Sequence, residues 1–230
     1  MLRLLAVAVA LAGGPFDGSL TGWTRFDGDF PPARVEVVGG ELQVTPERSW
    51  WVDGTRAFYL YRSASGDFAA TIHVNVTGLA TPMPQRDWSL SGLLLRSPKS
   101  TKQDESWVSL RVGAVGGGWF YERKTTLHSR SRLDLTEAGP GWVQLRVARV
   151  GSLFVLLTRR PDERWRLLAS YPRPDLRGPL QVGIDAFSGD EDTSADLVSH
   201  VDAFHVTPLR VPARVRRSGK LTTLLPYLTR

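Results

Sequence analysis

Hydrophobic and polar residues alternate along most of this chain. From Asp67 to Val76, one face of an extended backbone is apolar and the other is mostly polar or small. The apolar face holds Phe68, Ala70, Ile72, Val74 and Val76, and the other holds Ala69, Thr71, His73 and Asn75. A period of two residues is typical of a β-strand that buries one face. No long stretch shows the 3.6-residue period of an amphipathic helix, so the pattern predicts an all-β protein.

Short turns separate several pairs of these segments. Gly39-Gly40 joins residues 35–38 to 41–45, and Gly151-Ser152 joins residues 142–149 to 153–158, which predicts two hairpins. Further strands are expected at 57–62, 90–96, 107–115, 119–125, 165–171, 180–187 and 201–206. About a dozen strands at this spacing favour an antiparallel sandwich of two sheets.

The composition agrees with one folded domain. The chain has 230 residues, of which 42% are hydrophobic and 23% charged, and it contains no Cys. This hydrophobic fraction excludes a disordered chain, and single all-β domains commonly reach about 200–250 residues. The lack of Cys excludes disulfides, thiol catalysis and cysteine-ligated zinc.

Positive charge is concentrated at the C-terminal end. The formal net charge is +6, and residues 210–230 contain no Asp or Glu but six basic residues, namely Arg210, Arg214, Arg216, Arg217, Lys220 and Arg230. The rest of the chain has 23 basic and 23 acidic residues. We therefore expect a sandwich over residues 13–207 and a basic tail over residues 208–230. Such a tail is either solvated or attached non-specifically to an anionic surface, and it predicts no specific nucleic-acid recognition. Its residues 221–228 are apolar enough either to dock back on the domain or to bind a partner.

The first residues have the features of a secretory signal peptide. Met1-Leu2-Arg3 supplies one positive charge, residues 4–12 are apolar, and Ala10-Leu11-Ala12 fits a cleavage site. The apolar run is too short to cross a bilayer of about 30 Å. Residues 1–12 are therefore expected to be a cleaved signal, with a buried N-terminal strand as the alternative. Export without Cys favours a secreted protein or one of the bacterial cell envelope.

Motifs along residues 16–207 follow the order found in one superfamily. They are Phe16-Asp17-Gly18, Gly22-Trp23, Gly66-Asp67-Phe68, Ser91-Gly92-Leu93, Trp107-Val108-Ser109-Leu110, Trp142-Val143-Gln144, Val182-Gly183-Ile184 and Val201-Asp202-Ala203-Phe204. In this order they resemble the concanavalin A-like lectin/glucanase superfamily, particularly its secreted laminin-G-like modules. The resemblance implies a jelly roll of two stacked sheets that often binds carbohydrate on its concave face or rim. It implies no activity, because this fold hosts lectins, hydrolases, lyases and structural modules.

The catalytic motifs of related enzymes are missing from the sequence. The Glu-x-Asp-x-x-Glu run of the superfamily's glucanases, which supplies a nucleophile and an acid, does not occur. Glu105 and Glu122 are isolated, and Asp185 is the one carboxylate expected inside a core strand. Thr71-Ile72-His73 is similar to the Gln-Ile-His of jelly-roll polysaccharide lyases, but the Gln and the Tyr base are missing. We predict no catalytic residues, and a glycoside hydrolase or polysaccharide lyase stays the alternative.

Acidic residues near the last strand suggest a structural calcium ion. Calcium takes six to eight oxygen ligands, which a loop with Asp190, Glu191 and Asp192 offers in part. The resemblance implies a calcium between the N-terminal segment and the last strand, with Asp17 or Asp27 and Asp202 as ligands. A solvated acidic loop is the alternative. His200 and His205 are five residues apart, so they are expected on opposite faces of one strand.

Strand arginines are the candidates for a glycan-binding face. Arg96, Arg111 and Arg123 alternate with apolar residues, which predicts that they project away from the core. A guanidinium can hydrogen-bond sugar hydroxyls or a carboxylate, and Trp rings stack on sugars. The Trp candidates are Trp88 and Trp119, beside strand starts, and the pair Trp50-Trp51.

The predicted ligand site therefore comprises Trp88, Arg96, Arg111, Trp119 and Arg123, with His73 and Asp185 added. It belongs to a secreted, non-catalytic module that binds a polysaccharide or glycan on its concave face. A carbohydrate-active enzyme and a structural envelope module are the other interpretations, and for the arginine face an ordinary polar surface is the alternative.

Overall fold

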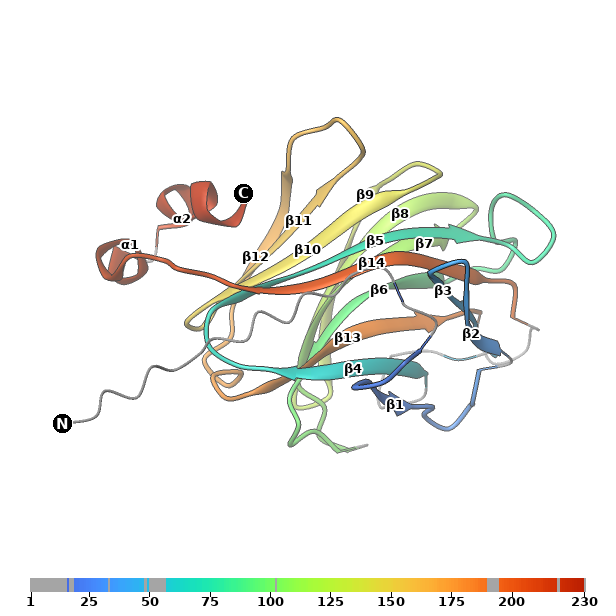
Figure 1. The fold of residues 1–230 in the computed structure, drawn as a ribbon, viewed down its shortest axis with the longest axis horizontal. Helices are drawn as coiled ribbons and strands as arrows, with labels where there is room; N and C mark the ends of the chain where they lie inside the picture. Colours follow the sequence, from blue (N-terminus) through green and yellow to red (C-terminus); the bar gives the residue numbers. More distant parts are fainter. Residues whose placement is uncertain are drawn as a thin grey trace.

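The computed structural model describes residues 16, 19–32, 34–47, 49, 57–101, 103–189, 195–218 and 220–229. These residues form fourteen strands and two short helices (Figure 1). The strands are β1 (Thr24–Phe26), β2 (Arg34–Val38), β3 (Glu41–Thr45), β4 (Phe58–Ala64), β5 (Phe68–Thr77), β6 (Ser89–Arg96), β7 (Trp107–Val115), β8 (Gly118–Leu127), β9 (Arg130–Glu137), β10 (Val143–Val150), β11 (Leu153–Arg159), β12 (Arg166–Pro172), β13 (Leu180–Phe187) and β14 (Val198–Pro208). The helices are α1 (Ala213–Ser218) and α2 (Leu221–Leu228).

The strands form two antiparallel sheets of seven strands each. The first sheet has the order β1-β4-β13-β6-β7-β8-β9, and the second has the order β12-β11-β10-β5-β14-β3-β2. Each strand that the alternation predicts is present, and the two-sheet sandwich is confirmed. The edge strand β9 was not predicted because its sequence is mostly polar and charged, as is common for edge strands.

The main core lies between the two sheets. Every strand except β1 and β9 contributes alternate side chains to it, as in β5, where Phe68, Ile72 and Val74 are buried. The predicted hairpins are also confirmed. Gly39 and Gly40 have φ values of +60° and +83°, which suit the tight turn between β2 and β3.

A β-bulge in β14 changes which residues share a face. Val201 pairs with Val74 and Ala203 pairs with His73, so Asp202 is the extra residue. Because of this insertion, Val201 and Phe204 both enter the core, although they are three positions apart. His200 and His205 therefore lie on the same outer face of the second sheet, and the expectation of opposite faces is wrong.

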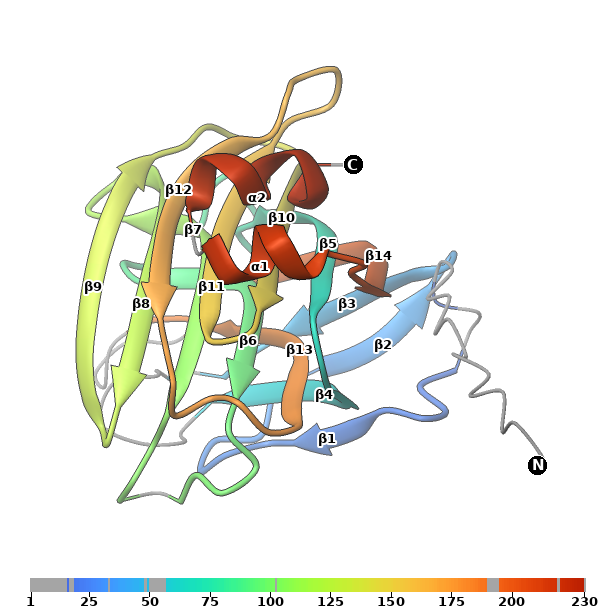
Figure 2. The same ribbon diagram turned by 90° about the vertical axis from the view of Figure 1, so that its left-hand side faces the viewer.

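The C-terminal helices pack on the outer face of the second sheet, in front of β10 and β11 in Figure 2. Leu224 and Leu228 of α2 are buried with Val211 against apolar side chains of β5, β10 and β11, which are Ala69, Ala148, Val150, Val155 and Leu157. Arg216 of α1 pairs with Asp67 at 2.8 Å. The tail is therefore a docked element and not a solvated end, as its apolar residues had suggested.

Several sequence predictions fall outside the described residues. They concern the signal at residues 1–12, Asp17, Trp50, Trp51 and the acidic loop at residues 190–192. In the part of the chain that is described, neither helix reaches the length and apolarity needed to cross a membrane.

Candidate functional site

A row of residues crosses all seven strands of the first sheet. Strand register places in line Phe26, Tyr59, Asp185, Gly92, Arg111, Glu122 and Leu135. Their chain neighbours Leu60, Ile184, Leu93 and Leu110 belong to the core between the sheets. This transverse row therefore lies on the outer face of the first sheet, which is turned away from the second sheet.

Arg111 is the centre of the transverse row. Its Nε donates to Asp185 Oδ2 at 2.7 Å, and its Nη1 donates to Glu122 Oε1. The guanidinium carbon lies 5.3 Å from the centroid of the Trp107 ring and 5.1 Å from that of Phe187. Arg111 and Asp185 have no exposed surface, and Glu122 is 1% exposed. The outer face thus contains a buried ion triad bordered by aromatic rings.

Gly92 explains how Arg111 reaches Asp185 on a strand that is not its neighbour. Gly92 of β6 stands between them in the row, and it has no side chain to block the guanidinium. A Cβ atom at Gly92 would meet the Leu110 carbonyl oxygen at 2.2 Å and Arg111 Cα at 2.6 Å. The close approach of the β6 and β7 backbones therefore requires glycine at this position.

Burial shifts the proton affinities in the triad. Burial raises the pKa of the Asp185 carboxyl group, and although Arg111 opposes this effect, the negative charge of Glu122 adds to it. Burial also acts to lower the pKa of Arg111, but the two carboxylates outweigh it and raise the value above normal. Arg111 is thus held as a cation, whereas Asp185 binds a proton more readily than an exposed Asp. Asp185 Oδ1 is buried, and no described residue donates a hydrogen bond to it.

A second buried ion pair lies at the far end of β6. Arg96 donates from Nε and Nη2 to the two carboxylate oxygens of Glu105, both at 2.8 Å, and from Nη1 to Gln181 at 2.9 Å. Arg96 also donates to the Ser100 carbonyl, so it fixes the loop between β6 and β7. Both Arg96 and Arg111 leave the core on the predicted side, but they are buried there and do not form an exposed polar surface.

Partly exposed aromatic side chains surround this buried layer. Phe26, Tyr61, Trp88 and Phe120 all pack against the apolar residues of the outer face, and we call these four residues the aromatic rim. Trp88 has a φ of +55°, a left-handed conformation that is costly for a bulky residue. The Asp87 carboxylate accepts hydrogen bonds from the backbone N–H groups of Trp88 and Gly116, which holds Trp88 beside the hairpin between β7 and β8.

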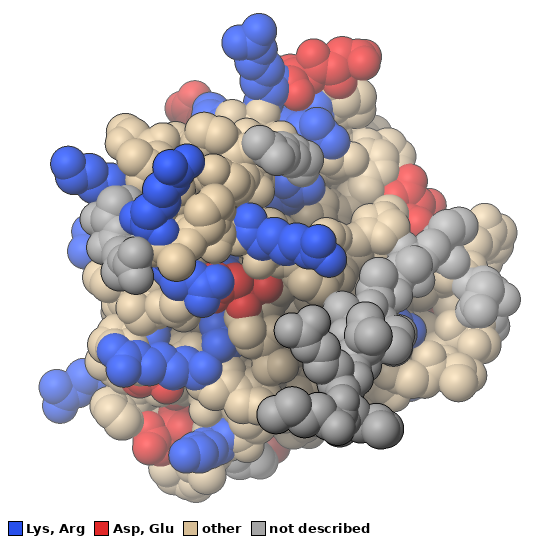
Figure 3. Space-filling view, turned by 60° about the vertical axis from the view of Figure 1, so that its left-hand side comes forward, with Lys and Arg blue, Asp and Glu red and all other residues tan. Residues whose placement is uncertain are grey.

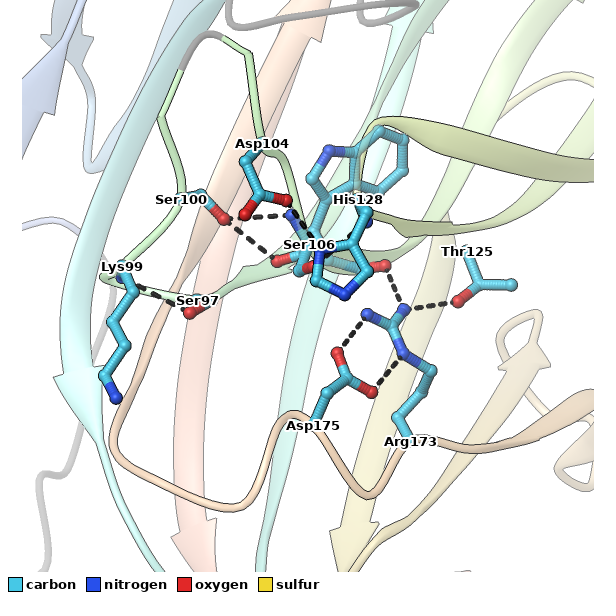
Figure 4. Close-up of polar contacts among 10 residues, drawn as sticks. Ser97, Lys99, Ser100, Asp104, Ser106, Thr125, His128, Arg173 and Asp175 are labelled. Carbon is cyan, nitrogen blue, oxygen red and sulfur yellow. Dashed lines mark hydrogen bonds and ion pairs between the residues drawn. The ribbon is translucent and has the colours of Figure 1, made fainter.

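Polar contacts connect the two sheets at the end where β7 begins (Figure 4). Arg173 donates to the Trp107 carbonyl at 2.7 Å and to Thr125 Oγ1 at 2.6 Å, and it forms a two-point ion pair with Asp175. Burial acts to raise the pKa of Asp175, but Arg173 holds it below its usual value. Nearby, His128 Nδ1 lies 2.8 Å from Asp104 Oδ1. These contacts tie loops to the sheet.

The structure separates the other predicted ligand residues from this face. Arg123 lies on the inner side of β8 and donates to carbonyl groups of β12 and β9, so its predicted direction is wrong. Trp119 is four residues before Arg123 on β8, so it projects from the same side of the strand and packs against the core between the sheets. His73 lies on the second sheet, where its Nδ1 is 2.8 Å from Asp202 Oδ1 and its ring is 4.7 Å from Trp142.

Several residues of the site were not assigned to it from the sequence, namely Phe26, Tyr61 and Phe120 of the aromatic rim and Glu122 and Tyr59 of the transverse row. Glu122 pairs directly with Arg111 because the turn at Gly116-Gly117 sets the register of β7 and β8. Treating that turn as a two-residue hairpin would have revealed the pair. Tyr59 could not be found in this way, because its neighbour in the row, Asp185, is distant in sequence.

Asp27 and Asp202, the predicted calcium ligands that the structure describes, each have a different partner. Asp27 pairs with Arg25 at 2.6 Å, and Asp202 pairs with His73. Among the described residues, no three His, Asp or Glu side chains are close enough together to hold a metal ion. Calcium binding stays a prediction, since Asp17 lies outside that part of the chain.

No family model matches the chain, and no curated protein sequence matches it. Solved structures do resemble it. The GH43 protein BlXynB from Bacillus licheniformis aligns with a TM-score of 0.67 and 12% identity over 85% of this chain and 39% of its own. This chain therefore spans about two fifths of that protein.

Two further structures align over nearly their whole length. A lectin from Bauhinia forficata in complex with GalNAc has a TM-score of 0.57 and 12% identity, covering 85% of this chain and 96% of its own. An immunostimulatory antigen and pseudo β-1,3-glucanase of Mycobacterium tuberculosis has a TM-score of 0.59 and 13% identity, covering 87% and 99%. The chain thus has the concanavalin A-like β-sandwich fold, which it shares with lectins and glucanase-like proteins.

Proposed function

We propose that this protein is a carbohydrate-binding module that binds a glycan over the aromatic rim of the first sheet. The observation that carries the proposal is Trp88, a partly exposed aromatic residue that Asp87 holds in a strained backbone conformation. Such strain persists where surrounding structure enforces it, and it is concentrated at binding sites. The likeness to lectins agrees with this proposal and does not by itself establish it.

The chemistry of the rim suits the apolar face of a sugar ring. Trp88 and Phe120 border one end of the outer face, and Tyr61 stacks on Tyr59 with ring centroids 5.0 Å apart. An aromatic ring buries much apolar area at little entropic cost, and the buried ion triad beneath makes the face rigid. Arg111, Asp185 and Arg96 therefore act as a support for the rim, since their charged groups are buried and already paired.

A glycoside hydrolase on the same face is the second candidate. It rests on Asp185 and Glu122, because a general acid needs the raised pKa that burial gives Asp185. Both carboxylates are bound to the same guanidinium and have almost no exposed surface. Binding without catalysis is therefore the better-supported function.

A panel of insoluble polysaccharides tests the proposal. Trp88→Ala and Phe120→Ala are expected to weaken retention about tenfold each, which corresponds to about 1.4 kcal/mol. Trp142→Ala is the matched control, because Trp142 is also partly exposed but lies on the second sheet beside His73. Equal retention of all variants would contradict the proposal, and release of reducing sugar that Asp185→Asn abolishes would favour the enzyme.

We also propose that the protein is exported, on the basis of its first twelve residues. Expression of the full chain with its natural N-terminus, followed by mass spectrometry of the exported form, should find a mature N-terminus near Gly13. An intact Met1 on a protein retained in the cytoplasm would contradict export.

A further inference from the structure

A pocket lies between the C-terminal helices and the second sheet, far in the fold from the aromatic rim. It has a volume of about 270 Å³. Its lining includes Ala69 of β5, Arg146 of β10, Thr207 of β14, Tyr227 of α2 and Arg210, which lies between β14 and α1. This volume is slightly below the range of about 300–1,000 Å³ that is typical of drug-sized ligands. It suits one small chemical group rather than a chain of sugars.

Contacts with described residues hold Arg146 in the wall of this pocket, and three of them are defined in detail. Its Nε donates to Thr71 Oγ1 at 2.9 Å, its Nη1 donates to the Leu228 carbonyl at 2.7 Å, and its guanidinium carbon lies 4.2 Å from the centroid of the Trp165 ring. The side chain is therefore pre-organised, so a ligand would not have to immobilise it. The contact with Leu228 also makes the pocket dependent on the docked helix α2.

Two arginines are held close together here. Arg159 also lies over the Trp165 ring, with its guanidinium carbon 4.6 Å from the centroid. Burial, together with the positive charge of Arg159, lowers the pKa of Arg146 to about 10. Positive charge in a partly buried site attracts anions more strongly than the same charge in open solvent.

Arg210 adds a further cation at the mouth of the pocket. It is exposed, and within the described residues it makes no hydrogen bond or ion pair. The tail that carries it holds six basic residues and no acidic one. Figure 3 shows Lys and Arg side chains predominating on the side of the molecule where the helices dock. Thr207 and Tyr227, whose side chains carry hydroxyl groups, also belong to the lining.

We propose that this pocket binds a single oxyanion, either a phosphate or a sulfate group, through Arg146 and Arg210. Arginine presents N–H groups in a planar fork that matches the oxygens of such groups. The site is distinct from the proposed glycan face, because it lies on the other sheet. It also differs from diffuse attraction by the basic tail, because two particular arginines define it. The same group could come as a free ion, on a sulfated polymer or on a phospholipid.

Thermal unfolding in phosphate tests the site directly. Sodium phosphate is titrated against sodium chloride at equal ionic strength, and a ligand of the native state raises the Tm by mass action. We expect a saturable rise with phosphate only. Arg210→Gln should weaken the apparent phosphate affinity about tenfold, whereas Arg214→Gln, which removes the same charge from α1 outside the pocket, should change it less than twofold.

A further variant and two binding experiments distinguish loss of the phosphate site from loss of the docked helix. Arg146→Gln should abolish the phosphate effect, but it also removes the bond to Leu228, so the decisive comparison is Arg210→Gln against Arg214→Gln. Two binding experiments identify the source of the group. Retention on dextran sulfate but not on dextran indicates a sulfated polymer, and retention on phosphatidylglycerol but not on phosphatidylcholine vesicles indicates a phospholipid. In either case the variants should rank as they do in the phosphate titration. The proposal would be overturned if chloride raised the Tm as much as phosphate does, or if Arg210→Gln and Arg214→Gln lowered the apparent phosphate affinity equally. Neutral-glycan retention through Trp88 is unaffected by these variants, so the two proposals fail separately.

Discussion

At the scale of single residues, the centre of the first sheet depends on a glycine and an arginine together. Gly92 lets the β6 and β7 backbones approach, and Arg111 extends over it to bind Asp185. Removing one partner of a buried ion pair typically costs about 3–5 kcal/mol, because the remaining charge is left uncompensated. Arg111 is therefore a structural residue of the outer face, and its loss would disturb the aromatic rim indirectly.

Gly92→Ala is expected to destabilise the protein strongly. The new Cβ would lie 2.2 Å from the Leu110 carbonyl oxygen, which belongs to the backbone and cannot rotate away. Overpacking of this kind costs about 1–3 kcal/mol or more. Urea unfolding measures the loss, and Gly178→Ala is the control because a Cβ at Gly178 meets nothing within 4 Å. Similar midpoints for the two variants would contradict the geometry of the β6–β7 pair.

Asp185 makes an unusual contribution to the pH dependence of stability. Its pKa is raised in the folded state, so the native protein binds this proton more tightly than the unfolded chain does. The free energy of unfolding contributed by Asp185 is therefore largest below its ordinary pKa of 3.8 and falls as the pH rises through the raised value. Most carboxylates paired in a native state have the opposite slope.

Asp185→Asn removes this titration. We expect the difference in unfolding free energy, wild type minus variant, to fall as the pH rises above 3.8, by at most about 1.36 kcal/mol per pH unit. Urea unfolding of both proteins from acidic to neutral pH gives this difference, in which titrating groups that do not interact with Asp185 cancel. A difference that stays constant or rises with pH would show that the Asp185 pKa is not raised.

At the scale of elements, α2 is held by packing and not by its own helical stability. It has eight residues, an internal Pro226 and no side-chain cap, and an isolated helix of this length is unstable in water. Leu224 and Leu228 are its buried contacts with the second sheet, and the Leu228 carbonyl accepts a hydrogen bond from Arg146. The docked state therefore depends on a few apolar side chains.

Leu224→Ala should release α2 from the sheet. Replacing a buried Leu by Ala costs about 2–5 kcal/mol, which is large for so short an element. Amide hydrogen exchange should become much faster in α2 while the strands keep their protection. Thr222→Ala, an exposed position in the same helix, should leave the exchange unchanged. Unchanged protection in Leu224→Ala would mean that other contacts hold the helix.

Local alternation did not settle every element. The bulge at Asp202 reversed the expected side of His205, because one inserted residue shifts all later side chains to the other face. Arg123 was placed on the wrong side of its strand because its polar character was read as exposure. In fact its guanidinium lies between β8 and β12, the edge strand of the second sheet, and donates to backbone carbonyls of β12 and β9.

At the scale of the whole molecule, the tail has two separate effects. It supplies six basic residues, without which the chain has 23 basic and 23 acidic residues. It also covers apolar side chains of the second sheet, among them Val155 and Leu157. An exposed apolar patch and a net charge near zero both favour association.

Truncation after Pro208 is therefore expected to cause association. Light scattering should give a larger apparent mass for the truncated chain than for the full chain at the same concentration, together with stronger binding of an apolar dye. The triple variant Arg210→Gln, Arg214→Gln and Lys220→Gln lowers the charge but keeps the cover, so it should behave like the full chain. Association of the triple variant to the same degree would assign the effect to charge alone.

The sequence alone determined most of the strands and, within strands that have no bulge, which side chains share a face. This was possible because the two-residue period is a local property of extended backbone, and because glycine turns fix the register of adjacent strands such as β2 and β3. The all-β class and the superfamily resemblance followed from this pattern and from the order of short motifs.

Only the tertiary structure decided what each face contacts. Arg111 meets Asp185 through pairings that join β13 to β6 and β6 to β7, 74 residues apart in sequence, and no local signal specifies such a pairing. The same holds for the tail, whose apolar residues needed a partner surface that only the folded second sheet provides. Alternation fixes the side from which a side chain projects, whereas burial and charge pairing depend on which distant strand or helix lies opposite.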